Sequence, residues 1–232
     1  MGTDAPQSWP VVSWPVVSRP VVSWTVVIPV KLLALAKSRL SGLADDDRKT
    51  VALAMAADTV TAAVTCPPVG DVIVVSDDPA VRTEAEAAGA TVIADLPAAG
   101  LNEALTAGAD HAAATWSGRG VAALTADLPA LSAAELAVAL TAAAGVNHAF
   151  VADAAGSGTT LYTAMPGVAF EPRFGPGSRR RHREAGAVEL DLPGIPGLRR
   201  DVDTLADLCQ AAQIGLGART LSVRESINAG CA

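Results

Sequence analysis

Short apolar runs alternate along this chain with longer segments in which apolar residues recur at the spacing of an amphipathic helix. Runs rich in valine and isoleucine predict buried strands, whereas the longer Ala- and Leu-rich segments predict helices. The expected strands cover 26–28, 71–75, 91–93, 121–124, 148–152, 160–163 and 188–190. The expected helices cover 79–88, 101–114 and 133–144, and a last helix runs from Asp203 or Thr204 to Gly215.

This alternation predicts an α/β fold with a mostly parallel central sheet and helices on both faces. Local signals agree with the helix limits: Asp78 can cap a helix that starts with Pro79, and Ser132 with Glu135 forms a capping box. The stretch 150–200 is richer in Gly and Pro, which predicts an antiparallel edge with substrate loops rather than a second domain.

The N-terminus consists of repeats. Residues 8–27 read as four pentads, Ser-Trp-Pro-Val-Val twice, then Ser-Arg-Pro-Val-Val and Ser-Trp-Thr-Val-Val. Proline in three of them excludes a regular helix and disfavours a central strand, and the segment lacks the parts of a secretory signal. We therefore expect an extension over 1–24, one domain over 25–216, and a tail without clear pattern over 217–232.

Composition narrows the class of protein. A formal charge of −7 argues against nucleic-acid or anionic-membrane binding, which need a positive field. No apolar run reaches the ~20 residues of a membrane span. The widely separated Cys66, Cys209 and Cys231 suit reduced thiols, so we expect a cytoplasmic protein. The oligomeric state is left open, with a homodimer as one alternative.

Charged residues follow the predicted strands. Asp127 comes three positions after the end of the run 121–124, and the carboxyl edge of an open α/β sheet is where such folds bind ligands. The alternative for this residue alone is a cap of the next helix. Lys31, Lys37 and Arg39 follow the first strand, a loop that suits a polyphosphate, although a solvated basic surface is the alternative. Together with a Gly/Thr turn at 156–160 and the late Asp201-Val-Asp203, these segments predict a site for a metal-bound nucleotide.

Three further side chains have competing interpretations. Asp77 can face the ligand at the end of its strand, whereas Asp78 is better explained as a helix cap. Asn102 either contacts the base or ribose of a nucleotide, or simply starts a helix.

Acidic residues predict a metal site. Asp201 and Asp203 precede the last helix, and with Asp127 they offer the carboxylate oxygens that Mg²⁺ prefers and shares with substrate phosphates. We expect only one of Asp201 and Asp203 to reach the metal directly, and the other to cap the helix.

A Gly/Thr turn at 156–160 and the segment 174–183 suit an anionic ligand, because glycines allow close backbone approach beside hydroxyl groups. Ser178 is expected to open a helix whose N-terminal dipole favours an anion. We interpret the Arg-rich run as a solvated helix face with one or two inward arginines, and His182 as a surface residue or hydrogen-bond donor rather than a base.

These motifs, in unbroken order from about residue 26 to 214, closely resemble the 2-phospho-L-lactate/phosphoenolpyruvate guanylyltransferases of coenzyme F-420 biosynthesis. The resemblance rests on Lys31 with Ala-Lys37-Ser-Arg39-Leu, Val-Ser-Asp77-Asp78, Gly-Leu-Asn102, Asp127-Leu-Pro, Gly-x-Gly-Thr159, Phe-Gly175-Pro-x-Ser178-x-x-x-His182 and Asp201-Val-Asp203-Thr. It implies a GT-A/Rossmann-like nucleotidyltransferase fold.

The resemblance also implies roles for individual residues. Thr159, Gly175 and Ser178 would hold the acceptor, and Lys31 and Lys37 would face the GTP phosphates. Asp127 with an Asp of the 201–203 pair would hold Mg²⁺. Arg39, Asp77 and Asn102 complete the expected nucleotide-binding set.

The expected reaction joins GMP from GTP to phosphoenolpyruvate and releases diphosphate. 2-Phospho-L-lactate and 3-phosphoglycerate are alternative acceptors. A molybdenum-cofactor or sugar-phosphate nucleotidyltransferase is a second enzyme reading, although the usual glycine loop is replaced by Val30-Lys31. A nucleotide-binding regulatory module without catalysis is the alternative from another class, and it would predict a broken acidic set.

Overall fold

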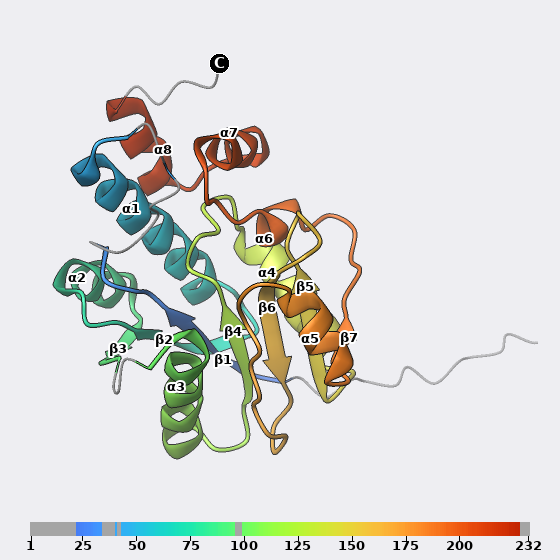
Figure 1. The fold of residues 1–232 in the computed structure, drawn as a ribbon. Helices are drawn as coiled ribbons and strands as arrows, with labels where there is room; N and C mark the ends of the chain where they lie inside the picture. The colour runs from blue at the N-terminus through green and yellow to red at the C-terminus, as the bar shows by residue number, and fades with distance from the viewer. Residues whose placement is uncertain (1–21, 34–39, 41–42, 96–98, 228–232) are drawn as a thin grey trace, which may run out of the picture.

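The computed structural model describes residues 22–33, 40, 43–95 and 99–227. In this part of the chain seven strands form one sheet in the order β3-β2-β1-β4-β6-β5-β7 (Figure 1). The strands are β1 (Trp24–Pro29), β2 (Val69–Val75), β3 (Thr91–Ile93), β4 (Gly120–Leu124), β5 (His148–Ala152), β6 (Thr159–Ala164) and β7 (Val188–Glu189). The helices are α1 (Asp45–Val64), α2 (Pro79–Ala88), α3 (Leu101–Thr115), α4 (Ala133–Ala143), α5 (Ser178–Glu184), α6 (Pro196–Arg199), α7 (Leu205–Ile214) and α8 (Ala218–Ser226).

The sheet is mostly parallel, as predicted. β1 pairs in parallel with β2 and β4, β2 pairs in parallel with β3, and β5 in parallel with β7. β6 is the exception, because it runs antiparallel to both β4 and β5. The start of β6 therefore lies beside the carboxyl end of β4, which brings the Gly/Thr turn to the edge that carries Asp127.

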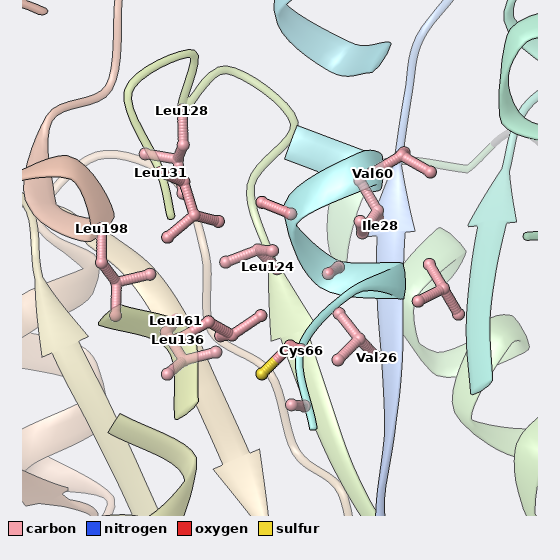
Figure 2. Packing of buried hydrophobic residues seen from close by; sticks show 14 of the residues in the cluster. Val26, Ile28, Val60, Cys66, Leu124, Leu128, Leu131, Leu136, Leu161 and Leu198 are labelled. Atoms are coloured by element: carbon pink, nitrogen blue, oxygen red, sulfur yellow. The ribbon is translucent and has the colours of Figure 1, made fainter. Parts of the chain in front are cut away.

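Helices cover both faces of the sheet, which explains why the central strands are apolar at consecutive positions. Val26 and Ile28 of β1 pack with residues of α1, α2 and α4 in the larger cluster, part of which Figure 2 shows. Val27 points to the other face and packs with α3 and with aromatic side chains of β5 and β6. The alternation along a single strand thus separates two cores.

Three helices, α1, the short α6 and α8, were not among the predicted elements. α1 is the longest helix, but its buried residues are spread around the helix and its N-cap, Ala44, makes no side-chain cap. It therefore lacks both the one-sided stripe and the cap from which a helix is recognised in sequence. α8 lies in the tail for which no pattern was expected, and it packs against α1 (Figure 1). Asp58 of α1 joins the two by accepting the backbone N–H groups of Arg219 and Thr220.

The described residues form no helix that is long and apolar enough to cross a membrane. Cys66 is a buried free thiol, and burial raises its pKa to about 11. Cys209 is disulfide-bonded, so the expectation that all the cysteines are reduced thiols is wrong for this residue. The first three pentads lie outside the described residues except for Val22, whereas the fourth, residues 23–27, leads into β1.

Candidate active site

Two adjoining cavities lie at the carboxyl edge of the parallel strands. The first, of about 280 Å³, extends from the end of β1 to Asp77 after β2 and to Leu101 of α3. The second, of about 340 Å³, extends from the end of β1 to Asp127 after β4. Lys31 lines both, so this predicted cation is at the centre of the site. Lys37 and Arg39 lie outside the described residues.

The first cavity carries two carboxylates. Asp77 is exposed, and its Oδ1 accepts the backbone N–H of Asp95 at 3.1 Å. Burial and the neighbouring charge of Asp77 raise the pKa of Asp95, against the lowering effect of Lys31. Asp77 lines this cavity just after β2, and Asp95, which was not predicted, lines it too.

Asp78 has the structural role that the sequence favoured. Its Oδ1 accepts from the backbone N–H groups of Ala80 and Val81 at the start of α2, which makes it the N-cap. Its Oδ2 also accepts from Leu33 N–H at 3.0 Å. One carboxylate therefore holds both the helix and the chain that follows β1.

Hydrogen bonds connect the segment around Asp127 to α1 and to the segment 201–203. Thr59 of α1 is fully buried, and its hydroxyl accepts from Leu128 N–H at 3.2 Å and lies 3.3 Å from the carbonyl oxygen of Ala126. The backbone carbonyl of Asp127 accepts from Val202 N–H at 3.0 Å. This last bond places the Asp201–Asp203 segment directly beside Asp127, although the two are far apart in sequence.

The carboxylates of the site influence one another. Burial is the main cause that raises the pKa of Asp201 to about 7, and the charges of Asp127, Asp153 and Asp203 contribute to the same shift in that order. Asp203 lines the same cavity as Asp127. The late pair thus contributes two charged groups to one cluster.

The expectation that one Asp of this pair caps the last helix is wrong. Thr204 is the N-cap of α7, because its hydroxyl accepts from Asp207 N–H while Asp207 accepts from the backbone of Thr204. Thr204 has its own capping partner three residues on, so neither member of the pair is needed at the helix end.

Asp153 is a site residue that the sequence analysis missed. It is 7% exposed, and its two carboxylate oxygens accept from the N–H groups of Ser157 and Gly158. It shapes the Gly/Thr turn while its charge reaches Asp201. Like Asp127 it stands just beyond the end of a buried apolar strand, and this shared signal could have found it.

The acceptor set predicted by resemblance gathers near the start of β6. Thr159 is buried there, and the neighbouring Thr160 carbonyl accepts from Thr125 N–H, a residue of the second cavity. Ser178 is buried at the first position of α5, as expected. Gly175 has φ of 112°, a left-handed conformation that favours glycine.

Asn102 and His182 hold this region together. The Asn102 amide accepts from Phe174 N–H at 2.7 Å and donates to Phe174 O at 3.2 Å, so it connects α3 to the loop before α5. His182 is fully buried, which excludes the surface interpretation, and its ring makes hydrogen bonds on both nitrogens.

The acidic set suits a magnesium ion by the chemistry of its donors. Hard oxygen ligands and a surplus of negative charge fit Mg²⁺, which typically takes one or two carboxylates and completes its shell with phosphates and water. Among the described residues, no three acidic, His or Cys side chains are arranged to hold a metal by themselves.

A third cavity, of about 350 Å³, lies at the opposite edge of the sheet. Trp116, Arg119 and Phe170 line it near the start of β1. Its volume is similar to that of the second cavity, but the cationic and acidic residues described above lie at the other edge. We therefore place the active site at the carboxyl edge.

Comparison with known proteins identifies the family. The family model described as CofC-like guanylyl transferase matches residues 24–192. The chain belongs to this family. Membership makes it a guanylyltransferase and favours this reading over the molybdenum-cofactor and regulatory alternatives.

Curated relatives cover nearly the whole domain. The phosphoenolpyruvate guanylyltransferase of Thermomonospora curvata is 54% identical over 200 residues, which cover 86% of this chain and 88% of the relative. The enzyme of the same name from Streptomyces coelicolor is 54% identical over 201 residues, which cover 86% and 95% of the two chains.

Solved structures confirm the predicted fold. A protein from Desulfovibrio desulfuricans described as a nucleotide-diphospho-sugar transferase superposes with a TM-score of 0.66 at 15% identity, over 89% of this chain and 95% of the other. A nucleotidyl transferase from Methanothermobacter gives 0.55 at 17% identity, over 83% and 97%. At these identities the likeness concerns the fold alone.

Proposed function

We propose that this guanylyltransferase transfers GMP from GTP to phosphoenolpyruvate, with Mg²⁺ as its metal, in coenzyme F-420 biosynthesis. The observation that carries the proposal is that Lys31, Asp127 and Asp203 line one cavity at the carboxyl edge of the sheet. The choice of phosphoenolpyruvate is supported by the names of the relatives at 54% identity.

The first cavity suits the guanine base. Its volume of about 280 Å³ is close to the range of small-molecule sites, and Leu101 supplies an apolar wall. Guanine presents two neighbouring N–H donors, N1–H and N2–H, on its pairing edge, whereas adenine presents an N–H donor beside an acceptor nitrogen, and ionised carboxylates are acceptors only. Asp77 and Asp95 therefore favour guanine over adenine at this position.

The reaction needs little acid–base chemistry. An oxygen of the acceptor phosphate forms a bond to the α-phosphorus of GTP, the bond from that phosphorus to the bridging oxygen breaks, and diphosphate leaves with the electron pair. Because the acceptor phosphate is already anionic, the protein contributes alignment and charge neutralisation. Lys31 supplies positive charge against the triphosphate, while Thr159 and Ser178 hold the acceptor.

Mg²⁺ would be held by Asp127 and by Asp203 or Asp201, and when bound it would neutralise charge on the triphosphate. Burial is the largest cause of the raised pKa of Asp201, and repulsion by the charges of Asp127, Asp153 and Asp203 adds to it. A divalent cation offsets that repulsion, so nucleotide and metal are expected to bind together.

The test is diphosphate release with GTP, measured separately with phosphoenolpyruvate, 2-phospho-L-lactate and 3-phosphoglycerate, with Mg²⁺ or with a chelator. We expect release only with metal and with phosphoenolpyruvate as the best acceptor. Asp127→Asn should abolish turnover without unfolding the protein, and Asp46→Asn, on the exposed side of α1, is the matched control. Turnover that persists in Asp127→Asn would refute the metal assignment, and silence with phosphoenolpyruvate would refute the acceptor.

A further inference from the structure

His182 is held in an aromatic cage. Its ring stacks on Tyr162 with centroids 4.6 Å apart and touches Phe150 and Phe174 at 5.6 and 5.4 Å. The ring is completely buried, so both of its nitrogens depend on partners within the protein. These partners are the backbone of Arg173 and the hydroxyl of Thr159.

The partners determine the position of the imidazole proton. Arg173 N–H lies 2.9 Å from Nε2, and a backbone amide can only donate, so Nε2 must be the acceptor. A neutral ring then carries its proton on Nδ1, which donates to Thr159 Oγ1 at 3.0 Å. Burial and the charges of Arg181 and Arg173 lower the pKa of His182 to about 4, which keeps the ring neutral near pH 7.

This tautomer fixes the role of the Thr159 hydroxyl. A hydroxyl has one proton, and an imidazole with the opposite tautomer would accept it. Here the imidazole donates instead, so the Thr159 oxygen is the acceptor and its own proton stays available. Within the part of the chain that the structure describes, the Thr159 hydroxyl makes no hydrogen bond besides the one to His182.

We propose that His182 is a positioning residue that turns the Thr159 hydroxyl into a donor toward the phosphate of the acceptor substrate. The inference rests on the proposed function, because it takes the ligand beside Thr159 to be an anion. A phosphate offers only acceptors, so it gains a hydrogen bond from a hydroxyl whose proton is directed to it. The hydrogen bonds run in one direction, from Arg173 N–H through the imidazole and the hydroxyl to the substrate.

Steady-state kinetics test the role in catalysis. His182→Phe keeps an aromatic ring in the cage but has no donor, and Thr159→Val removes the hydroxyl at nearly constant volume. Each should raise the KM for phosphoenolpyruvate by roughly 10- to 100-fold, the range for a lost hydrogen bond to a charged group. The KM for GTP should change by no more than about twofold.

A double-mutant cycle separates positioning from a structural role. If His182 acts through Thr159, adding His182→Phe to Thr159→Val should raise the acceptor KM no further. An equal increase in both backgrounds, or a rise in both KM values together, would overturn the proposal. His182→Asn provides a rescue, because its amide can place a donor where Nδ1 lies, and it should restore part of the acceptor affinity.

A measurement without turnover tests the tautomer itself. The chain has three histidines, and the ¹⁵N signals that disappear in His182→Phe belong to His182. We expect the Nδ1-protonated neutral form near pH 7, and a shift of these signals when phosphoenolpyruvate is added. A proton on Nε2 would overturn the inference whether or not the enzyme is active. If the wild type shows the expected tautomer but no diphosphate release, the proposed function fails and the hydrogen-bond assignment stands.

Discussion

Acidification should destabilise this protein through His182. Burial, with the charges of Arg181 and Arg173, lowers the pKa of this residue from 6.5 to about 4 in the folded state. Between these two values the unfolded chain binds a proton on His182 that the folded protein does not bind. The stability contributed by the neutral ring is therefore complete above the unfolded pKa and is lost as the pH falls toward the folded one.

The magnitude follows from the width of this window. One pKa unit corresponds to ~1.4 kcal/mol, so the linkage amounts to about 2 kcal/mol between about pH 7.5 and pH 5. Asp201 works in the opposite direction, because its pKa is raised to about 7 and the folded protein therefore gains stability when this carboxyl is protonated. The effect of His182 on the free energy of unfolding is therefore measured by comparing two proteins that both contain Asp201.

Urea unfolding of the wild type and of His182→Phe, in chelator at both pH values, isolates that difference. The variant lacks the two hydrogen bonds of the ring at every pH, so its free energy of unfolding is shifted at both pH values. The wild type should lose about 2 kcal/mol more than the variant on acidification. Parallel curves would show that His182 titrates normally in the folded protein, which would refute the buried neutral ring.

Three further substitutions probe the frame of the site. Thr59→Val should cost about 1–3 kcal/mol in urea unfolding and reduce turnover, because Leu128 N–H loses its partner, while exposed Thr61→Val should change both little. Asp78→Ala should cost about 1–2 kcal/mol through the lost helix cap, and Asp78→Asn much less, so equal losses would contradict the capping role. Asp201→Asn should stabilise the metal-free protein by about 1–3 kcal/mol at about pH 8, allowing for solvent screening, and lower Mg²⁺-dependent turnover. A loss of stability in chelator would contradict the repulsion.

Much of the sheet could be predicted because its strands are buried on both faces and read as short apolar runs. The position of the site at the carboxyl edge of the sheet could be predicted from the same pattern, since Lys31, Asp77 and Asp127 each come after such a run. α1 could not be predicted in this way. Its many alanines are buried against neighbours on several sides, so tertiary packing rather than local pattern defines this helix.

The sequence predicted which residues belong to the acidic cluster better than it predicted how they are arranged in space. Asp127 and the late pair could be found as carboxylates ahead of loops, but their proximity depends on the bond from Val202 N–H to Asp127 O, which has no sequence signature. The capping role expected for one Asp of the pair failed because Thr204 and Asp207 satisfy the helix start by themselves. When two neighbouring residues could each cap a helix, the choice between them depends on which one has a capping-box partner three residues further along the chain.

The residues expected to bind the acceptor show what a sequence pattern cannot predict. Thr159 and His182 are separated by 23 positions, and the proton between them is assigned by a third group, Arg173 N–H. A motif can indicate that a threonine and a histidine occur together, but the direction of a hydrogen bond depends on every partner of both groups. Because one backbone amide fixes the tautomer, the same side chains in another loop could direct the threonine proton into the protein. The chemistry of this site therefore depends on loop geometry as much as on residue identity.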